Sequence, residues 1–271
     1  MNSVSNYLTS IKTMLKCNLF VALAASCAFA AAMLSAAPLV DPAVTDSQPG
    51  AGPFTSRPPY QAKFIANFTK RQQMDQQTVV FLGDSITEWW PKFGQAFPKL
   101  RVANRGIASD TTRGMLCRLQ DSVLSLNPQA IVIAGGINDL RPDNNPPGSP
   151  ETVAGNMKLM LSAIQKHDPK IPVLVCEILP SGIGTPETII SANQAVEKVV
   201  AGFPQAVCVK THAKFLNADG SQNKKLFSDK VHLKPQGYAI WQAVLASEFD
   251  RLGLKRITPP ATIPPPTRGE R

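Results

Sequence analysis

Five short runs of β-forming residues, separated by longer segments with a helical pattern, constrain the fold of this chain more than any other feature. The runs span residues 78–82, 101–104, 130–134, 173–178 and 206–211, and they show little alternation of polar and apolar residues. Strands of this kind are buried on both faces, as in a parallel sheet covered by helices. The pattern predicts an α/β fold, a three-layer α/β/α sandwich around a five-stranded parallel sheet of the flavodoxin-like type.

The helical pattern lies over residues 112–126, 151–167 and 187–203, with a last helix near 236–252. In a doubly wound sheet, ligands bind beyond the carboxyl ends of the strands. We therefore expect the chemistry of this chain in the loops that follow the five runs.

Proline and glycine mark the two borders of this core. Residues 38–58 are rich in Pro, Gly, Ser and Ala and have no regular period, which is typical of a linker. Repeated prolines interrupt any regular element after Leu254, so residues 255–271 are predicted to be a proline-rich basic tail. Between these borders, residues 59–254 are predicted to form one domain of roughly 200 residues.

The first 37 residues have the composition of a targeting segment. Lys12 and Lys16 precede an apolar stretch over 19–34 that ends in Ser35-Ala36-Ala37. We predict a signal peptide over 1–37 and export to the periplasm or the outside of the cell. A membrane anchor and lipidation at Cys27 are alternatives that the sequence favours less. No later stretch is comparably apolar, so no stable membrane span is expected after signal removal.

The cysteine pattern excludes two classes of small structural site. None of the five cysteines forms a C-x-x-C pair, which argues against a zinc ribbon or a disulfide-dense scaffold. Export would leave Cys117, Cys176 and Cys208, an odd number that cannot pair completely within one chain. Buried thiols are therefore expected, and a bridge between Cys176 and Cys208 stays open.

The net charge of +9 first suggests a nucleic acid or an anionic lipid as partner. The first 37 residues contribute +2 and the last 17 contribute +3, which leaves +4 on residues 38–254. Those charges are scattered, so the basic balance lies largely at the two ends. No nucleic-acid partner is predicted.

The first run is followed by Gly83-Asp84-Ser85, which places Ser85 in a strand-to-helix turn. Free N–H groups and the dipole at a helix N-terminus favour a developing negative charge there, as a nucleophilic serine requires. Asp84 and Ser85 are also good helix caps. These residues alone leave both interpretations open.

Polar residues also follow the second and third runs. Asp110, Thr111 and Thr112 are natural N-caps, and we assign them that structural role. Gly106 lets a backbone N–H approach a ligand, and the Asn138 amide at a strand end can donate to one. For each of these two positions alone, an ordinary turn residue remains the alternative.

Asp229 and His232 lie three residues apart before the last helix and can share a hydrogen bond that fixes the tautomer of the ring. The chain has two other histidines. His167 ends a predicted helix and is assigned to the surface. His212 follows the fifth run on the same edge of the sheet and is the rival candidate for a catalytic base.

Four blocks, in this order and spacing, resemble the SGNH or GDSL hydrolases over nearly the whole core. The blocks lie at residues 83–87, 104–112, 135–139 and 227–233. Three segments are most similar to the branch of the platelet-activating-factor acetylhydrolase catalytic subunits. Their sequences are Gly-Asp-Ser-Ile-Thr, Asn-Arg-Gly-Ile-x-x-Asp-Thr-Thr and, at 178–182, Ile-Leu-Pro-Ser-Gly.

The resemblance implies the flavodoxin-like SGNH hydrolase fold and a serine esterase that works through an acyl-enzyme, and with the predicted signal peptide this makes a secreted serine esterase. It implies no metal and no organic cofactor. The implied catalytic residues are Ser85 as nucleophile, His232 as base and Asp229 as the acid that orients it. The implied oxyanion donors are the N–H groups of Ser85 and Gly106 and the Asn138 side chain.

Two departures from the family pattern bear on the pocket rather than on the reaction. The family commonly has Gly where Ser109 stands and Thr where Ile137 stands. We expect a short-chain ester, acetyl above all, of a small molecule or polysaccharide, because the loop over 140–150 adds no apolar helix to cover a long acyl chain. The alternatives are a lysophospholipase or lipid esterase of the same fold and a non-catalytic secreted carbohydrate-binding module. Trp89 and Trp90 either stack on a sugar or belong to the core.

Overall fold

The computed structural model describes residues 58–144 and 146–254, with a five-stranded sheet at the centre. The strands are β1 (Val79–Gly83), β2 (Val102–Gly106), β3 (Ala130–Ala134), β4 (Val173–Cys176) and β5 (Ala206–Val209). Neighbouring strands are all parallel, in the order β2-β1-β3-β4-β5. This is the flavodoxin-like doubly wound order, so the predicted fold class is confirmed.

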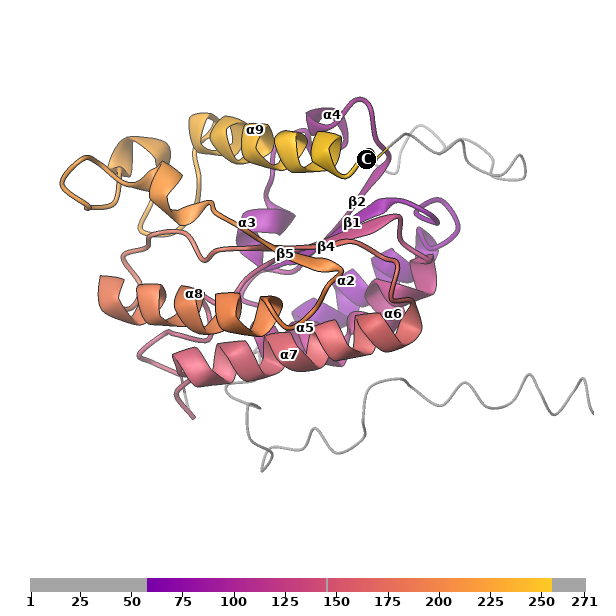
Figure 1. The fold of residues 1–271 in the computed structure, drawn as a ribbon, viewed down its shortest axis with the longest axis horizontal. Coiled ribbons are helices and arrows are strands. Elements are labelled where there is room, and N and C mark those ends of the chain that lie inside the picture. The colour runs from indigo at the N-terminus through magenta and orange to yellow at the C-terminus, as the bar shows by residue number, and fades with distance from the viewer. Residues whose placement is uncertain (1–57, 145, 255–271) are drawn as a thin grey trace, which may run out of the picture. The chain divides into compact units, whose positions relative to one another are not determined.

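Helices cover both faces of the sheet (Figure 1). One face carries α4 (Phe93–Ala96) and α9 (Pro235–Arg251). The other face carries α2 (Pro58–Lys70), α5 (Thr112–Cys117), α6 (Leu119–Ser122), α7 (Pro150–His167) and α8 (Pro186–Val200). The chain also forms the short helix α3 (Ser85–Glu88) and the 3-10 turns η1 (Leu124–Leu126), η2 (His212–Phe215) and η3 (Lys224–Leu226).

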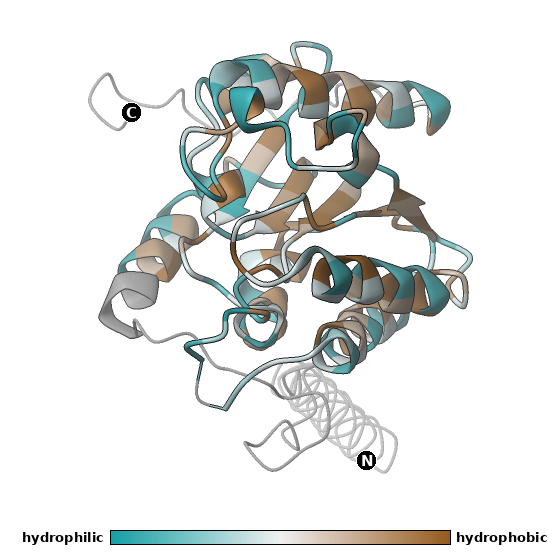
Figure 2. Cartoon of the chain, turned by 90° about the vertical axis from the view of Figure 1, so that its left-hand side faces the viewer, coloured by the Kyte–Doolittle hydropathy of each residue, from teal (hydrophilic) through white to brown (hydrophobic). Residues whose placement is uncertain are grey.

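The register of the sheet brings three loops to one place. Gly83, the last residue of β1, lies level with Gly106 of β2 and Ala134 of β3. The loops that leave these strands therefore start side by side at one edge, which faces the viewer in Figure 2. This is the edge at which the sequence pattern places the chemistry.

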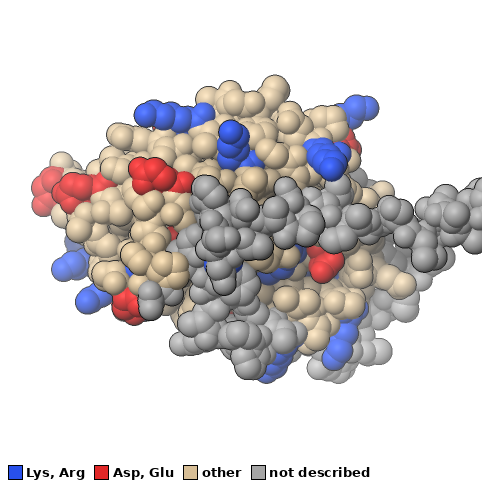
Figure 3. Space-filling model, turned by 90° about the horizontal axis from the view of Figure 1, so that it is seen from below, with Lys and Arg blue, Asp and Glu red and all other residues tan. Residues whose placement is uncertain are grey.

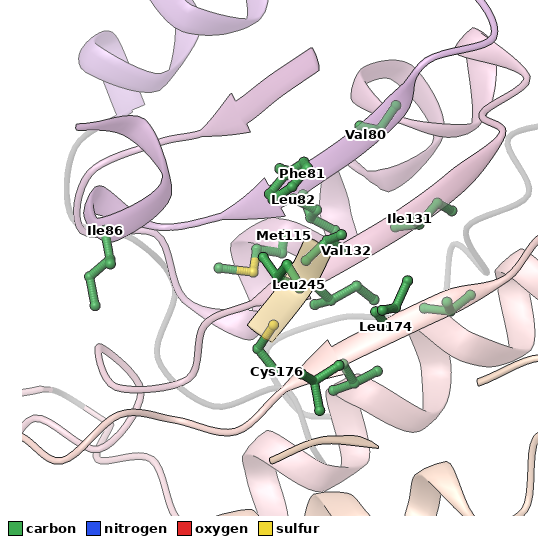
Figure 4. Close-up of a cluster of buried hydrophobic side chains, with 14 of the residues drawn as sticks. Val80, Phe81, Leu82, Ile86, Met115, Ile131, Val132, Leu174, Cys176 and Leu245 are labelled. Carbon is green, nitrogen blue, oxygen red and sulfur yellow. The ribbon is translucent and has the colours of Figure 1, made fainter. Parts of the chain in front are cut away.

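Apolar side chains fill the space between the layers, and the strands are the most hydrophobic part of the view in Figure 2. Figure 4 shows part of this core, with strand residues such as Val132 and Leu174 next to Leu245 of α9. On the α9 side the core is aromatic: the Phe81 ring meets that of Phe249 edge-on at 6.1 Å between ring centroids. Such pairs add about 0.5–1.5 kcal/mol each to the stability gained from burial.

The predicted helix over 112–126 is broken into α5, α6 and η1, which corrects that expectation. The break lies at Arg118, which is 5% exposed and whose guanidinium donates to Asp110 Oδ2 at 2.8 Å and to the Gly83 carbonyl at 3.1 Å. A buried cation needs such partners, and both lie outside the helix, in the loop before α5 and at the end of β1. Helix α2 is a further difference, because no helix is predicted over 58–70.

The remaining sequence predictions concern thiols, membrane spans and charge. Cys176 and Cys208 are free thiols, so the open bridge between them is absent. Cys176 is buried as expected, whereas Cys117 is exposed, so the expectation of a buried thiol is wrong for Cys117. Within the described ranges, no helix combines the length and hydropathy that a membrane crossing requires. On the face shown in Figure 3, basic and acidic side chains are interspersed. The predicted signal peptide (1–37), the linker up to residue 57 and the tail (255–271) lie outside the described residues.

Candidate active site

Ser85 opens helix α3 directly after β1. Asp84 is the N-cap of this helix, and its Oδ1 accepts a hydrogen bond from the Ile86 N–H at 2.9 Å. A Cβ on Gly83 would lie 2.1 Å from the Thr87 hydroxyl and 2.8 Å from the Ala134 carbonyl oxygen, so this tight turn requires glycine. Asp84 therefore carries out the capping role that the sequence left open, and the Ser85 hydroxyl has another partner.

That partner is His232, which arrives from the loop before α9. Ser85 Oγ lies 2.9 Å from His232 Nε2, and His232 Nδ1 lies 2.6 Å from Asp229 Oδ2. With the proton on Nδ1, the ring donates to the carboxylate and Nε2 accepts from the serine hydroxyl. A hydroxyl, an imidazole and a carboxylate that are hydrogen-bonded in this order form the arrangement that activates a serine as a nucleophile.

The Asp229 carboxylate is held by its own loop. Its Oδ1 accepts hydrogen bonds from the backbone N–H groups of Val231 at 2.7 Å and His232 at 2.8 Å. Partial burial acts to raise the pKa of Asp229, but the hydrogen bonds from His232 and Val231 outweigh it and bring this pKa below its usual value. The carboxylate is thus ionised at neutral pH and can stabilise a protonated His232.

Backbone hydrogen bonds fix the loop that carries these two residues. The Ser228 N–H donates to the His232 carbonyl at 2.8 Å, and the Lys234 N–H donates to the Leu226 carbonyl at 2.8 Å. From the loop after β4, the Gly182 N–H donates to the Lys230 carbonyl at 2.8 Å. Three backbone hydrogen bonds therefore hold the loop that carries His232 and Asp229.

The other two histidines lie elsewhere. His212 Nδ1 is 2.8 Å from the Ile178 carbonyl, and its backbone N–H donates to the Glu177 carboxylate at 3.0 Å. These bonds hold His212 against the end of β4, so it does not contact Ser85. His167 is half-buried in the last turn of α7.

The predicted oxyanion donors differ in their present partners. Asn138 is 8% exposed and uses one amide hydrogen to reach the Asp110 carbonyl at 3.0 Å, which leaves the second hydrogen to donate. The Gly106 N–H already donates to Asn104 Oδ1 at 2.9 Å. A Cβ on Gly106 would lie 2.2 Å from the Glu88 backbone nitrogen, so this glycine allows α3 to pack against β2.

Ser109 is a residue that the sequence reasoning did not place in the site. Its φ is +65°, in the left-handed region that costs an ordinary residue about 1–2 kcal/mol. Within residues 58–144 and 146–254 its N–H has no hydrogen-bond acceptor. The following residue supplies the carbonyl that holds Asn138. The available signal was the departure at this position, because a family that commonly has glycine there indicates a left-handed backbone.

Three buried aspartates join the loops beneath the site. Asp110 forms the ion pair with Arg118, and Thr111 rather than Asp110 is the N-cap of α5, which corrects that assignment. Asp139 accepts from the Thr112 backbone N–H at 2.9 Å and from its hydroxyl at 2.5 Å. Burial raises the pKa of both Asp84 and Asp139 to about 7, and the neighbouring Asp110 carboxylate adds to this effect.

The two tryptophans after the nucleophile separate. Trp90 is 5% exposed and stacks on Trp241 in the core, with ring centroids 4.8 Å apart. Trp89 is 52% exposed, and its ring lies 4.3 Å from the ring of His232. The core alternative therefore holds for Trp90 alone.

A small apolar cavity adjoins the triad without being lined by Ser85 or His232. Its walls include Ile86, Ile137, Ile178, Leu179 and Val231, and the centre of a water molecule can reach about 20 Å³ of it. Among the described residues, no group of three or more His, Cys, Asp or Glu side chains is arranged to hold a metal ion.

Comparisons with known proteins agree with this geometry. The model of the GDSL-like Lipase/Acylhydrolase family matches residues 81–240. The alpha1 subunit of platelet-activating factor acetylhydrolase IB from Pongo abelii is 30% identical over 169 residues, which are 59% of this chain and 70% of the relative.

Two solved structures share the fold. A GDSL-like lipase from Bacteroides thetaiotaomicron has a TM-score of 0.60 and 24% identity over 69% of this chain and 99% of its own. The acetyl xylan esterase AlAXEase has a TM-score of 0.54 and 21% identity over 63% of this chain and 98% of its own. Because the family model covers more than half of the chain, this protein is a hydrolase of the GDSL-like lipase/acylhydrolase family.

Proposed function

We propose that this protein is a serine esterase that cleaves its substrate through an acyl-enzyme. The observation that carries the proposal is the continuous chain from Ser85 through His232 to Asp229. Nε2 of His232 takes the hydroxyl proton of Ser85 as its oxygen attacks the ester carbonyl. The protonated ring then gives that proton to the leaving alcohol and becomes neutral again. In the second half of the reaction, the neutral ring takes a proton from a water molecule, which attacks the acyl-enzyme and releases the acid.

The negative charge on the tetrahedral oxygen needs donors that are already in place. We assign this role to the Ser85 N–H at the start of α3 and to the second amide hydrogen of Asn138. The sequence-based third donor, the Gly106 N–H, would first have to leave Asn104. The Ser109 N–H has no such bond to break within the described ranges, and the proposal therefore includes Ser109 as the third donor.

The acyl group in this proposal is short, and acetyl is the preferred case. The apolar cavity whose walls include Ile86 and Val231, the neighbours of Ser85 and His232 in sequence, is small, since the centre of a water molecule can reach only about 20 Å³ of it. Residues 141–144 and 146–149 contain no helix, and α7 begins at Pro150, so among the described residues no added helix between β3 and α7 covers the site. The names of the relatives, an acetylhydrolase and an acetyl xylan esterase, support the same acyl group.

We also propose export, with an ester of a small molecule or polysaccharide as the substrate outside the cytoplasm. The support is the composition of residues 1–37, with Lys12 and Lys16 before an apolar stretch. Periplasmic or culture-supernatant fractions would contain the processed chain. Recovery of the full-length chain in the cytoplasm alone would contradict this part of the proposal.

Esters of one alcohol with acetyl, butyryl, octanoyl and palmitoyl groups test the acyl preference. We expect kcat/KM for acetyl to be at least as high as for the longer acyl groups, because an added methylene that meets no apolar wall gains none of the about 0.8 kcal/mol that its burial would contribute. The variant Ser85→Ala measures the background. A rise in kcat/KM toward palmitoyl would support the lipid-esterase alternative, and equal rates in wild type and Ser85→Ala would remove the serine mechanism.

A further inference from the structure

Trp89 stands out as an exposed aromatic side chain at the catalytic centre. The three tryptophans of the chain are at positions 89, 90 and 241, and only Trp89 is exposed. Its ring packs against that of His232 at a tilt of 39°. One face of the indole is thus supported by the catalytic base while half of the side chain remains open to solvent.

The orientation of Trp89 is fixed at its backbone and at its polar edge. Its backbone N–H donates to the Ser85 carbonyl at 2.9 Å, one helical turn below. Its Nε1–H donates to Glu88 Oε1 at 3.1 Å, and the other oxygen of the Glu88 carboxylate accepts from the Ala108 N–H. The ring is therefore tied to both α3 and the loop after β2, so it is an ordered platform.

The position of Trp89 relates it to one part of an ester. His232 delivers the proton to the leaving alcohol, so a group that packs on the His232 ring lies on the alcohol side of the scissile bond. We infer that the exposed face of Trp89 binds the pyranose ring of a carbohydrate alcohol and selects sugar esters. This inference rests on the proposed esterase function.

The chemistry around the platform favours a sugar over an alkyl chain. A pyranose offers a flat face of C–H groups to an indole and hydroxyl groups at its rim, which matches a ring with an apolar face and a polar edge. The Glu88 carboxylate lies at that edge. An alkyl chain laid along Trp89 would bring hydrocarbon against this charge, which is unfavourable.

The test compares three acetyl esters in the full-length protein: an acetylated methyl pyranoside, ethyl acetate and octyl acetate. Wild type, Trp89→Ala, Trp89→Phe and the control Ile190→Ala are assayed, because Ile190 is an exposed apolar residue of α8 outside the site. In Trp89→Ala we expect the ratio of kcat/KM for the pyranoside to that for ethyl acetate to fall roughly tenfold, mainly through KM. Phe should retain part of the preference, and Ile190→Ala should keep the wild-type ratio.

Other outcomes overturn the inference. An equal loss on all three esters would make Trp89 a residue that only positions His232. A loss greatest for octyl acetate would assign the platform to an alkyl chain, and an unchanged ratio in Trp89→Ala would leave it without a role in selection.

A second measurement does not depend on turnover. Acrylamide quenches exposed indoles, and Trp89 is the exposed one. We expect a methyl pyranoside without an ester to protect the wild-type fluorescence from quenching, and the absence of protection would contradict a sugar platform. If the wild type hydrolyses no acetate at all, the proposed function fails, while the protection experiment still reports on Trp89 alone.

Discussion

The substitution Asp139→Asn tests the buried acidic cluster beneath the nucleophile. Asp139 has no exposed surface, and burial raises the pKa of its carboxyl from 3.8 to about 7. The folded protein therefore holds a proton on Asp139 between about pH 4 and pH 7, whereas the unfolded chain does not. Because a raised folded-state pKa makes the folded state bind more protons, the stability of the wild type falls as the pH rises through this window.

The size of the effect follows from the displacement of the pKa. The pKa of Asp139 is raised by about 3, and each pKa unit corresponds to about 1.4 kcal/mol. The free energy of unfolding of the wild type should therefore fall by at most about 4 kcal/mol between pH 4 and pH 7. In the variant, the amide carbonyl can still accept from Thr112, but the side chain has no charge to gain. The free energy of unfolding of Asp139→Asn, relative to wild type, should therefore increase by up to about 4 kcal/mol over this window and stay constant above it.

Urea denaturation at about pH 4, 5, 6, 7 and 8 measures this difference in unfolding free energy. The matched control is Asp121→Asn on α6, because Asp121 is exposed and water screens its charge. Its curve should stay parallel to that of the wild type. If the Asp139→Asn curve is also parallel, or if its relative stability grows toward acid, the protonated buried carboxyl is refuted.

Three further predictions concern the triad and the oxyanion donors. His232→Ala should lower kcat by several powers of ten, whereas His212→Ala should be nearly silent; the reverse result in esterase assays would identify His212 as the base. Asn138→Ala should lower kcat by roughly 10²- to 10³-fold with little change in KM, and a change in KM alone would favour a turn residue. Gly106→Ala should destabilise the fold by about 3 kcal/mol or more, because its Cβ would lie 2.2 Å from a backbone nitrogen. Ser109→Gly should keep activity and raise stability by up to about 1 kcal/mol, because glycine adopts the left-handed backbone without strain. Denaturation measures both changes in stability and steady-state kinetics measure activity; a Gly106→Ala variant as stable as the wild type would contradict the close packing of α3 on β2.

The fold could be predicted because its signal is local and repeated. Each apolar run needs only its own residues to indicate a strand buried on both faces, and the helical segments between the runs determine that the strands are parallel. The helix over 112–126 could not be placed correctly because its break depends on Arg118, whose partners Asp110 and Gly83 lie outside the segment. Local periodicity contains no information about such contacts.

The site shows the same division. Ser85 and the Asp229 and His232 pair stand out as local motifs, but their approach across the chain was implied only by the family resemblance. The partner of the Gly106 N–H and the left-handed backbone of Ser109 depend on how two loops pack, which residue types alone do not determine. Trp89 and Trp90 are identical neighbours in sequence, and only the direction of the chain after α3 decides which one is buried.

Trapping the acyl-enzyme is the most direct test of the central claim. The purified protein is mixed with an activated acetyl ester, quenched in acid within milliseconds, digested and sequenced by mass spectrometry. The account predicts one acetyl group on Ser85, formed with a burst of released alcohol, and no such group in Ser85→Ala or His232→Ala. Hydrolysis by the wild type with no acetyl group on Ser85 at any quench time, or the same label in His232→Ala, would contradict it.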